Sequence, residues 1–203
     1  MPTPSSNRVI LIYGLWNVAP ILWPLQYSLK NHGWRPEIWD YPSTGYVALD
    51  ELARNLEKYI DSHHTGKPHI VAYSMGGLIA RYFIQKLGGT ERISSFITLA
   101  TPHHGTVRAN ILPGEGFVQM RVGSEFLRDL NSDLTPLTRI PFISLWTPWD
   151  ITVFPAKNSY LEEFPRMKIQ APLHNLITWM PSSLRVVNHA LRGAEVALAR
   201  QGG

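Results

Sequence analysis

Apolar residues along this chain alternate between short continuous runs and longer segments with helical spacing. The segment 8–13 ("RVILIY") is a continuous apolar run that ends at Gly14, which is typical of a strand buried on both faces of a parallel sheet. The segment 47–64 instead has the pattern of an amphipathic helix. Its apolar positions are Leu49, Leu52, Leu56, Tyr59 and Ile60.

The same alternation continues to the end of the chain and predicts the fold class. The expected strands are 8–13, 35–41, 67–74, 92–102, 141–147 and 166–171. The expected helices are one that ends near Gly33 and three that span 47–64, 75–89 and 182–201, the last with Ser182 or Ser183 as its N-cap. Strands that alternate with helices indicate an α/β fold, a mostly parallel sheet of about six strands with helices on both faces. We expect residues 1–203 to form one domain.

Residues from about 106 to 136 interrupt this rhythm. The segment contains Gly114, Gly116, Gly123 and a short helical pattern over 125–130. In an α/β enzyme an insertion of this kind lies over the strand ends, where it could act as a lid. The alternative is an excursion over the surface without a function.

Composition and charge exclude several classes of function. The chain carries a net charge of +4 without a dense run of Lys or Arg, so a nucleic-acid partner has little support. It contains no cysteine, which excludes disulfides, a thiolate nucleophile and thiolate metal ligands.

One uncharged stretch, 9–29, is long enough to be considered as a membrane span. Pro20 and Pro24 would break a helix there, and no cleavage site of a signal peptide follows a short apolar run. We therefore expect a soluble protein, and the cytoplasm is the favoured compartment unless a leader has been removed.

Ser74 lies between an apolar strand and a helix that begins with two glycines ("VAYSMGG"). A nucleophile elbow has this layout, because the sharp turn requires small residues around the serine. Here Ala72 replaces the usual first glycine, and Gly76 follows. The pattern predicts that Ser74 is a nucleophile, whereas the alternative is a small polar residue in an ordinary turn.

A nucleophilic serine needs a base, and the base needs an orienting carboxylate. On this architecture their order along the chain is Ser, then Asp or Glu, then His. Asp150 lies just past the carboxyl end of an expected strand and is the predicted acid; the alternatives are Asp129, Asp133, Glu162 and Glu163. His174 lies in the loop after the last expected strand and is the predicted base, whereas His189 falls on the polar side of the last helix.

An oxyanion hole requires two preorganised donors. One is expected to be the backbone amide of Met75, directly after the nucleophile. The other is expected from the loop after the first strand, where Leu15 is favoured over Trp16. Acyl transfer through an acyl-enzyme needs no cofactor and no metal. The adjacent residues His103 and His104 could also be read as metal ligands, but a structural turn at Gly105 is the better interpretation.

Taken together, "YGLWN", "AYSMGG", "LATPHHGT", "DITVFP" and a late loop histidine resemble the bacterial α/β-hydrolase lipases and esterases. The nearest likeness is to small lipases whose elbow begins with alanine. The resemblance implies an α/β-hydrolase fold and a carboxylic ester hydrolase with the triad Ser74, Asp150 and His174. It also implies an oxyanion hole formed by Leu15 and Met75. Two positions depart from the usual pattern, because Tyr13 and Tyr73 stand where relatives usually have histidine.

Aromatic residues near these blocks suggest an apolar acyl site, although each of them could equally be core packing. The candidates are Trp16, Trp149, Phe154 and Trp179. The expected partner is a small-molecule ester or lipid, with a transient lipid interface left open and the oligomeric state undetermined. Two rival functions use the same residues: an acyltransferase with the same triad, and a non-catalytic protein that binds a lipid or a partner.

Overall fold

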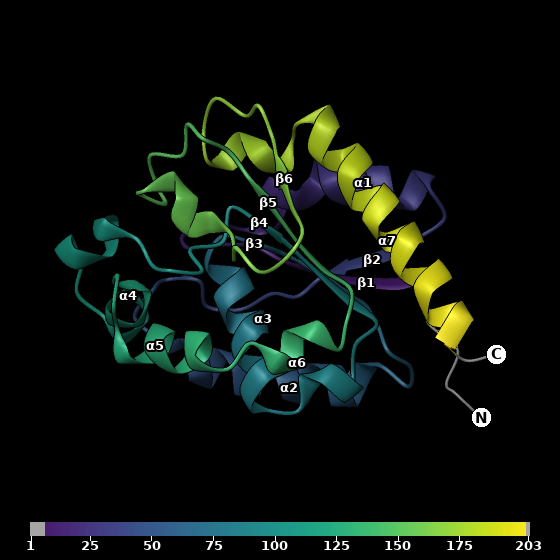
Figure 1. Cartoon of the computed structure of the whole chain (residues 1–203), viewed down its shortest axis with the longest axis horizontal. Coiled ribbons are helices and arrows are strands. Elements are labelled where there is room, and N and C mark those ends of the chain that lie inside the picture. The colour runs from purple at the N-terminus through teal and green to yellow at the C-terminus, as the bar shows by residue number, and fades with distance from the viewer. Residues whose placement is uncertain (1–6, 202–203) are drawn as a thin grey trace.

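The core of the structure is one six-stranded sheet in which every pair of neighbours is parallel (Figure 1). The computed structural model describes residues 7–201. The strand order is β2-β1-β3-β4-β5-β6. The strands are β1 (Arg8–Ile12), β2 (Arg35–Ile38), β3 (His69–Tyr73), β4 (Ser95–Leu99), β5 (Phe142–Trp146) and β6 (Arg166–Lys168). This confirms the α/β class and the six predicted strands.

Burial explains why the central strands are so apolar. Every residue of β3 and β4 is buried, because helices cover both faces of a parallel sheet. The strand β6 is different, since its three residues are all exposed at the edge of the sheet. Its Arg and Lys side chains discourage pairing with another sheet edge. It is also shorter than the predicted strand, which extended to residue 171.

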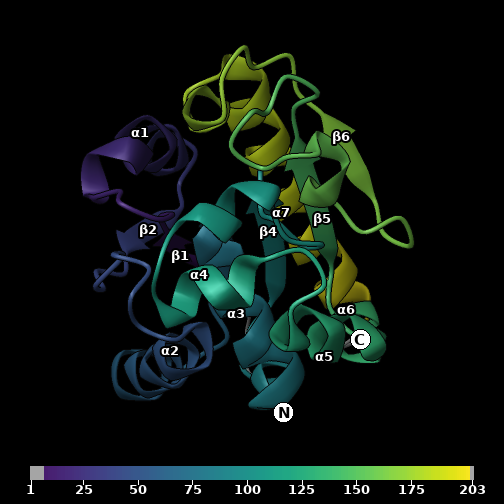
Figure 2. The ribbon, with the colours of Figure 1, turned by 90° about the vertical axis from the view of Figure 1, so that its left-hand side faces the viewer.

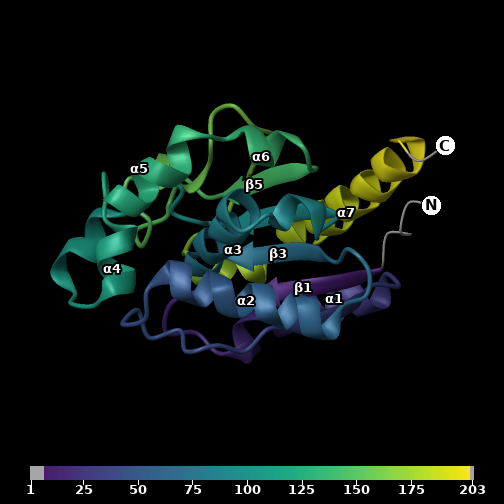
Figure 3. The same cartoon turned by 90° about the horizontal axis from the view of Figure 1, so that it is seen from below.

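Helices form a layer on each side of the sheet. The helices α1 (Trp23–Asn31) and α7 (Pro181–Gln201) lie on one face, and α2 (Leu49–His63) and α3 (Met75–Lys86) lie on the other (Figures 1 and 3). The predicted N-cap of the last helix is wrong: α7 begins at Pro181, one residue before Ser182. Proline suits the first helical position, because it needs no amide partner there and its φ is already helical.

The segment expected as an insertion is mostly short helices. These are α4 (Glu115–Met120), α5 (Glu125–Ser132), α6 (Thr135–Thr138) and a 3-10 turn at Val107–Ile111. Figure 2 views the molecule from the carboxyl ends of the strands, with α4 in front of the sheet. Further 3-10 turns are Ala19–Leu22, Gly89–Glu91, Ala156–Ser159 and Asn175–Thr178.

Within residues 7–201, no helix combines the length and the apolar character needed to cross a membrane.

Candidate active site

Ser74 occupies a sharp turn between β3 and α3. Its backbone has φ 54° and ψ −127°, a conformation that a residue other than glycine rarely adopts. The turn packs closely on the first strand, since a Cβ at Gly76 would lie 2.4 Å from the carbonyl oxygen of Tyr13. Only glycine fits at position 76, because any side chain there would collide with the backbone at the end of the first strand.

His174 lies beside Ser74 although 100 residues separate the two along the chain. Its Nε2 is 3.0 Å from Ser74 Oγ, and its Nδ1 is 2.6 Å from Asp150 Oδ2. The Nδ1–H therefore donates to the carboxylate, and Nε2 is left to accept the serine proton. The structure thus brings the three predicted residues into one hydrogen-bonded row.

Backbone donors hold the carboxylate of Asp150 in place. The loop after β5 turns back, so that Oδ1 accepts the amide N–H of Thr152 at 2.9 Å and of Val153 at 2.8 Å. Oδ2 then faces the imidazole, and the Asp150 side chain is fully buried. The other acids and the other late histidine that the sequence offered lie on the surface: Asp129, Asp133, Glu162, Glu163 and His189.

The two predicted oxyanion donors belong to residues near Ser74: Met75 follows it directly, and Leu15 lines the same cavity. Met75 is the first residue of α3, so its N–H has no acceptor within the helix. The Trp16 N–H donates to the Ser43 carbonyl at 2.7 Å. Of the two amides considered in the first loop, this leaves Leu15 as the candidate donor.

Ser74 and His174 line a cavity of about 160 Å³. Leu15 and Trp16 contribute to its wall, so the candidate donor and one of the predicted aromatic residues meet here. The other lining residues are Asn17, Pro102, Thr106, Arg108, Ala109, Leu112, Phe117, Met120, Thr152 and Val153. The insertion supplies about half of this wall, and most of its contribution is apolar.

The other predicted aromatic residues lie outside this cavity. Trp149 and Phe154 line a neighbouring hollow beside Asp150. The indole N–H of Trp179 donates to the Ile21 carbonyl at 3.0 Å, and its ring is half exposed. The structure therefore groups Trp16 with Ser74 and separates the other three from the cavity.

The sequence model of the alpha/beta hydrolase fold family matches residues 8–183. The chain belongs to the α/β-hydrolase family. Among solved structures, this hydrolase is similar to the mature lipase of Bacillus licheniformis, with a TM-score of 0.75 and 15% identity over 88% of this chain and 89% of that chain. It is also similar to the monoacylglycerol lipase of Paleococcus ferrophilus, with a TM-score of 0.66 and 14% identity over 96% and 97% of the two chains. A pyrethroid hydrolase from Sphingobium faniae has a TM-score of 0.62 and 14% identity over 95% and 98%.

The two tyrosines that depart from the usual hydrolase pattern pack around the site. Tyr13 and Tyr41 stack with ring centroids 4.9 Å apart, and the Tyr41 hydroxyl donates to the Tyr13 carbonyl at 2.7 Å. The Tyr13 hydroxyl donates to Asp40, and burial together with this carboxylate raises the pKa of Tyr13 to about 12. The Tyr73 ring lies 5.1 Å from the His174 ring, and burial raises its pKa. Both tyrosines are therefore neutral at pH 7; Tyr13 packs against Tyr41, and Tyr73 packs beside His174.

A buried arginine fixes the loop after β4 in this hydrolase. Arg81 of α3 is fully buried, and its guanidinium donates to the carbonyls of His103 and Leu130 and to the side chain of Asn131. Burial lowers the pKa of Arg81 to about 9, so the group remains a cation at neutral pH. Sequence reasoning missed this residue, because nothing in the helical pattern of α3 marks it as buried.

His103 belongs to the same hydrogen-bonded network as Arg81. Its Nδ1 faces Arg81 at 3.3 Å, and its Nε2 lies 3.1 Å from the Thr98 hydroxyl. Burial and the neighbouring Arg81 hold the pKa of His103 well below its usual range. His104 points to the surface, and Gly105 turns the chain with φ 84°. Across residues 7–201, no group of three or more His, Asp or Glu side chains is arranged to hold a metal ion.

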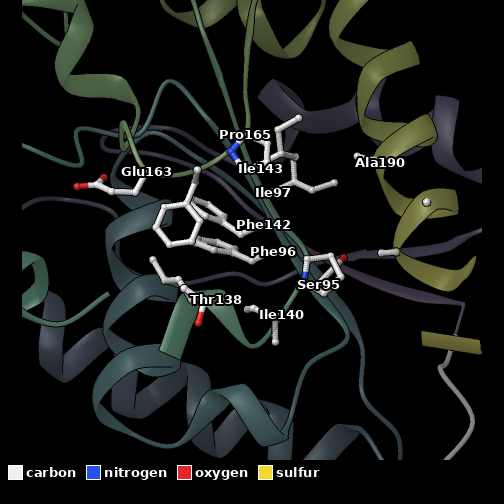
Figure 4. A pocket seen from close by; sticks show the side chains of 15 residues that line it. Ser95, Phe96, Ile97, Thr138, Ile140, Phe142, Ile143, Glu163, Pro165 and Ala190 are labelled. Atoms are coloured by element: carbon white, nitrogen blue, oxygen red, sulfur yellow. The ribbon is translucent and has the colours of Figure 1, made fainter. Parts of the chain in front are cut away.

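A third hollow, of about 530 Å³, lies at the amino ends of β4 and β5, away from Ser74 (Figure 4). Ser95 lines it, and Figure 4 shows the stacked rings of Phe96 and Phe142 below Ile143, with Ala190 of α7 across the space. This hollow is larger than the cavity at Ser74 but shares no lining residue with it.

Ser95 is also part of a hydrogen-bonded chain that contains a histidine and an acid. Its Oγ is 2.7 Å from His69 Nδ1, and His69 Nε2 is 2.8 Å from Glu195. However, Ser95 belongs to a strand, it is 2% exposed, and the next amide donates to the Pro141 carbonyl. The amide of Phe96, directly after Ser95, is thus already paired, whereas Met75, directly after Ser74, begins α3 and has no acceptor within that helix.

Proposed function

We propose that this α/β hydrolase is a serine-dependent carboxylic ester hydrolase that acts on apolar acyl esters. One observation carries the proposal: Asp150, His174 and Ser74 form a hydrogen-bonded row, and the Ser74 and His174 end of this row lines an apolar cavity. The likeness to proteins named lipases agrees with it.

The reaction follows from the positions of the atoms. Ser74 Oγ attacks the ester carbonyl while His174 Nε2 takes its proton. The amides of Leu15 and Met75 hydrogen-bond to the oxyanion of the tetrahedral intermediate. Asp150 keeps the proton of the neutral imidazole on Nδ1 and stabilises the imidazolium that forms.

Collapse of the intermediate breaks the ester C–O bond, and the alcohol leaves with the proton from His174. Water then attacks the acyl-Ser74 ester, with His174 again as the base, and the carboxylic acid is released. The partner is a small neutral ester, because an apolar cavity does not repay the cost of removing water from a charged substrate.

Hydrolysis of p-nitrophenyl esters tests the proposal, with Ser74→Ala and Ser95→Ala as a matched pair. Both variants remove one hydroxyl from a serine that bonds a histidine, but Ser74 lines the apolar cavity and Ser95 does not. We expect the Ser74→Ala enzyme to lose at least ~10³-fold in kcat, and the Ser95→Ala enzyme to keep its activity.

The outcome also separates the rival functions. A folded protein that hydrolyses no ester and does not transfer an acyl group to an added alcohol would be a binding protein. Transfer to the alcohol in preference to water would make it an acyltransferase with the same nucleophile. Equal hydrolysis by wild-type and Ser74→Ala enzymes would refute the proposal.

A further inference from the structure

We infer that this enzyme prefers short acyl groups, of about six carbon atoms or fewer, and that Phe117 sets this limit. The inference rests on the proposed function and names the substrate class for the same site. It follows from the volume of the cavity, from the residue that closes it and from the contacts that hold that residue in place.

The volume is small for a lipid chain. The cavity beside Ser74 measures about 160 Å³. An apolar protein cavity of about 150 Å³ accommodates one benzene ring, which has six carbon atoms. An acyl chain of about that size fills the space, and each further methylene has to displace a side chain or remain in water.

Phe117 is the bulkiest apolar residue from the insertion in this wall. Phe117 is buried, and it has the cavity on one side. On the other side it packs against Trp16, with centroids 5.7 Å apart, and against Tyr46, with centroids 6.5 Å apart. It also fills the space beside Gly45, where a Cβ would lie 2.4 Å from the ring. The Phe117 ring therefore separates the cavity from the loop that contains Gly45 and Tyr46.

The helix that carries Phe117 is fastened to the rest of the molecule. A Cβ at Gly116 would lie 2.8 Å from the carbonyl oxygen of Val47, so the two backbones are in direct contact. Gln119 accepts the amide N–H of Leu49 at the start of α2 and donates to Asp50 at 2.8 Å.

The cavity wall is also tied together from within the insertion. The Thr106 N–H donates to the Met120 carbonyl at 2.9 Å, and Arg121 donates to the Ala109 carbonyl at 3.3 Å. Three residues of the wall are thereby fixed relative to one another. The insertion therefore covers the cavity in a fixed position, so the cavity volume limits the length of the acyl chain.

The test is a series of p-nitrophenyl esters from acetate to dodecanoate, all dispersed in the same non-ionic detergent. We expect kcat/KM of the wild-type enzyme to be highest at butyrate or hexanoate and to fall at least ~10-fold by decanoate. Phe117→Ala removes a six-carbon ring, and the decanoate-to-butyrate ratio should rise at least ~10-fold. Val118→Ala is the control on the same helix, because Val118 is exposed and does not line the cavity.

A second variant changes the volume in the opposite direction, in case loss of the ring unfolds α4. Ala109 lines the cavity, so Ala109→Leu should move the optimum towards acetate. Circular dichroism and Tm establish that each variant is folded.

Three results would overturn the inference: a wild-type optimum at decanoate or longer, an unchanged profile in folded Phe117→Ala and Ala109→Leu enzymes, or a size limit in a series of alkyl acetates instead of the acyl series. Failure of the proposed function looks different, since no ester would then be hydrolysed or Ser74→Ala would hydrolyse them all equally well.

Discussion

Gly14→Ala should disable the enzyme by moving the nucleophile, although it leaves the chemical identity of every reacting group unchanged. Gly14 follows β1 and lies against the elbow. A Cβ added at this position would lie 2.7 Å from Ser74 Cβ and 3.2 Å from Ser74 Oγ. The backbone of Gly14 is not in the left-handed region, so the effect of the substitution is steric.

The size of the effect follows from the contact. Non-bonded carbon atoms are usually about 3.5–4.0 Å apart, so the two Cβ atoms must separate by about 1 Å. A displacement of about 1 Å at a reacting group can cost 10²-fold in rate, which corresponds to about 3 kcal/mol in the activation barrier. Overpacking at the same place should lower the free energy of unfolding by about 1–3 kcal/mol.

The assay is kcat for p-nitrophenyl butyrate, measured well below the Tm of the variant. Gly193→Ala is the matched control, because its added Cβ meets no atom within 4 Å on helix α7. That variant should keep full activity and gain about 0.5–1 kcal/mol of stability. A folded Gly14→Ala enzyme with the kcat of wild type would refute the tight packing of the first loop on the nucleophile.

Asp150→Asn should lower kcat by about 10⁴-fold with little change in Tm, because the imidazole loses the partner that sets its tautomer; a steady-state rate near wild type would contradict this. Arg81→Met should lower the free energy of unfolding, measured by urea titration, by about 3 kcal/mol, because it leaves the carbonyls of His103 and Leu130 without their donor. The control Lys86→Gln breaks an exposed ion pair and should lower the free energy of unfolding by no more than about 1 kcal/mol. The pKa of His103 is lowered in the folded protein, so as the pH falls its imidazole is protonated in the unfolded chain first. The free energy of unfolding should therefore fall as the pH drops below about 6.5, and His103 should contribute no pH dependence above that range. His103→Asn should flatten this acid limb of a Tm-against-pH curve, and an unchanged limb would assign the effect to other groups.

Much of the fold could be predicted from the sequence, because a strand covered on both faces has to be apolar throughout. The strand ends were harder to predict. The fourth strand was expected over 92–102 but ends at Leu99, since the chain turns at Ala100 with φ 48°. Ala100 is itself apolar, so hydrophobicity alone does not mark the turn.

The candidate site was predictable where the fold dictates an order along the chain. The order Ser, Asp, His identified three residues that the structure brings within hydrogen-bonding distance. The cavity was less predictable, because an aromatic residue on a loop gives no sign of where its ring points. Phe117 was not singled out, yet it lines the cavity, whereas Trp179 was singled out and lies outside it.

The most direct test of the central claim is to locate the reactive serine chemically. The enzyme is treated with a fluorophosphonate, and the labelled peptide is identified by mass spectrometry. We predict a single adduct on Ser74, abolished by prior denaturation and slowed strongly in Asp150→Asn. Ester hydrolysis with an adduct on Ser95, or with no adduct on Ser74, would contradict the account.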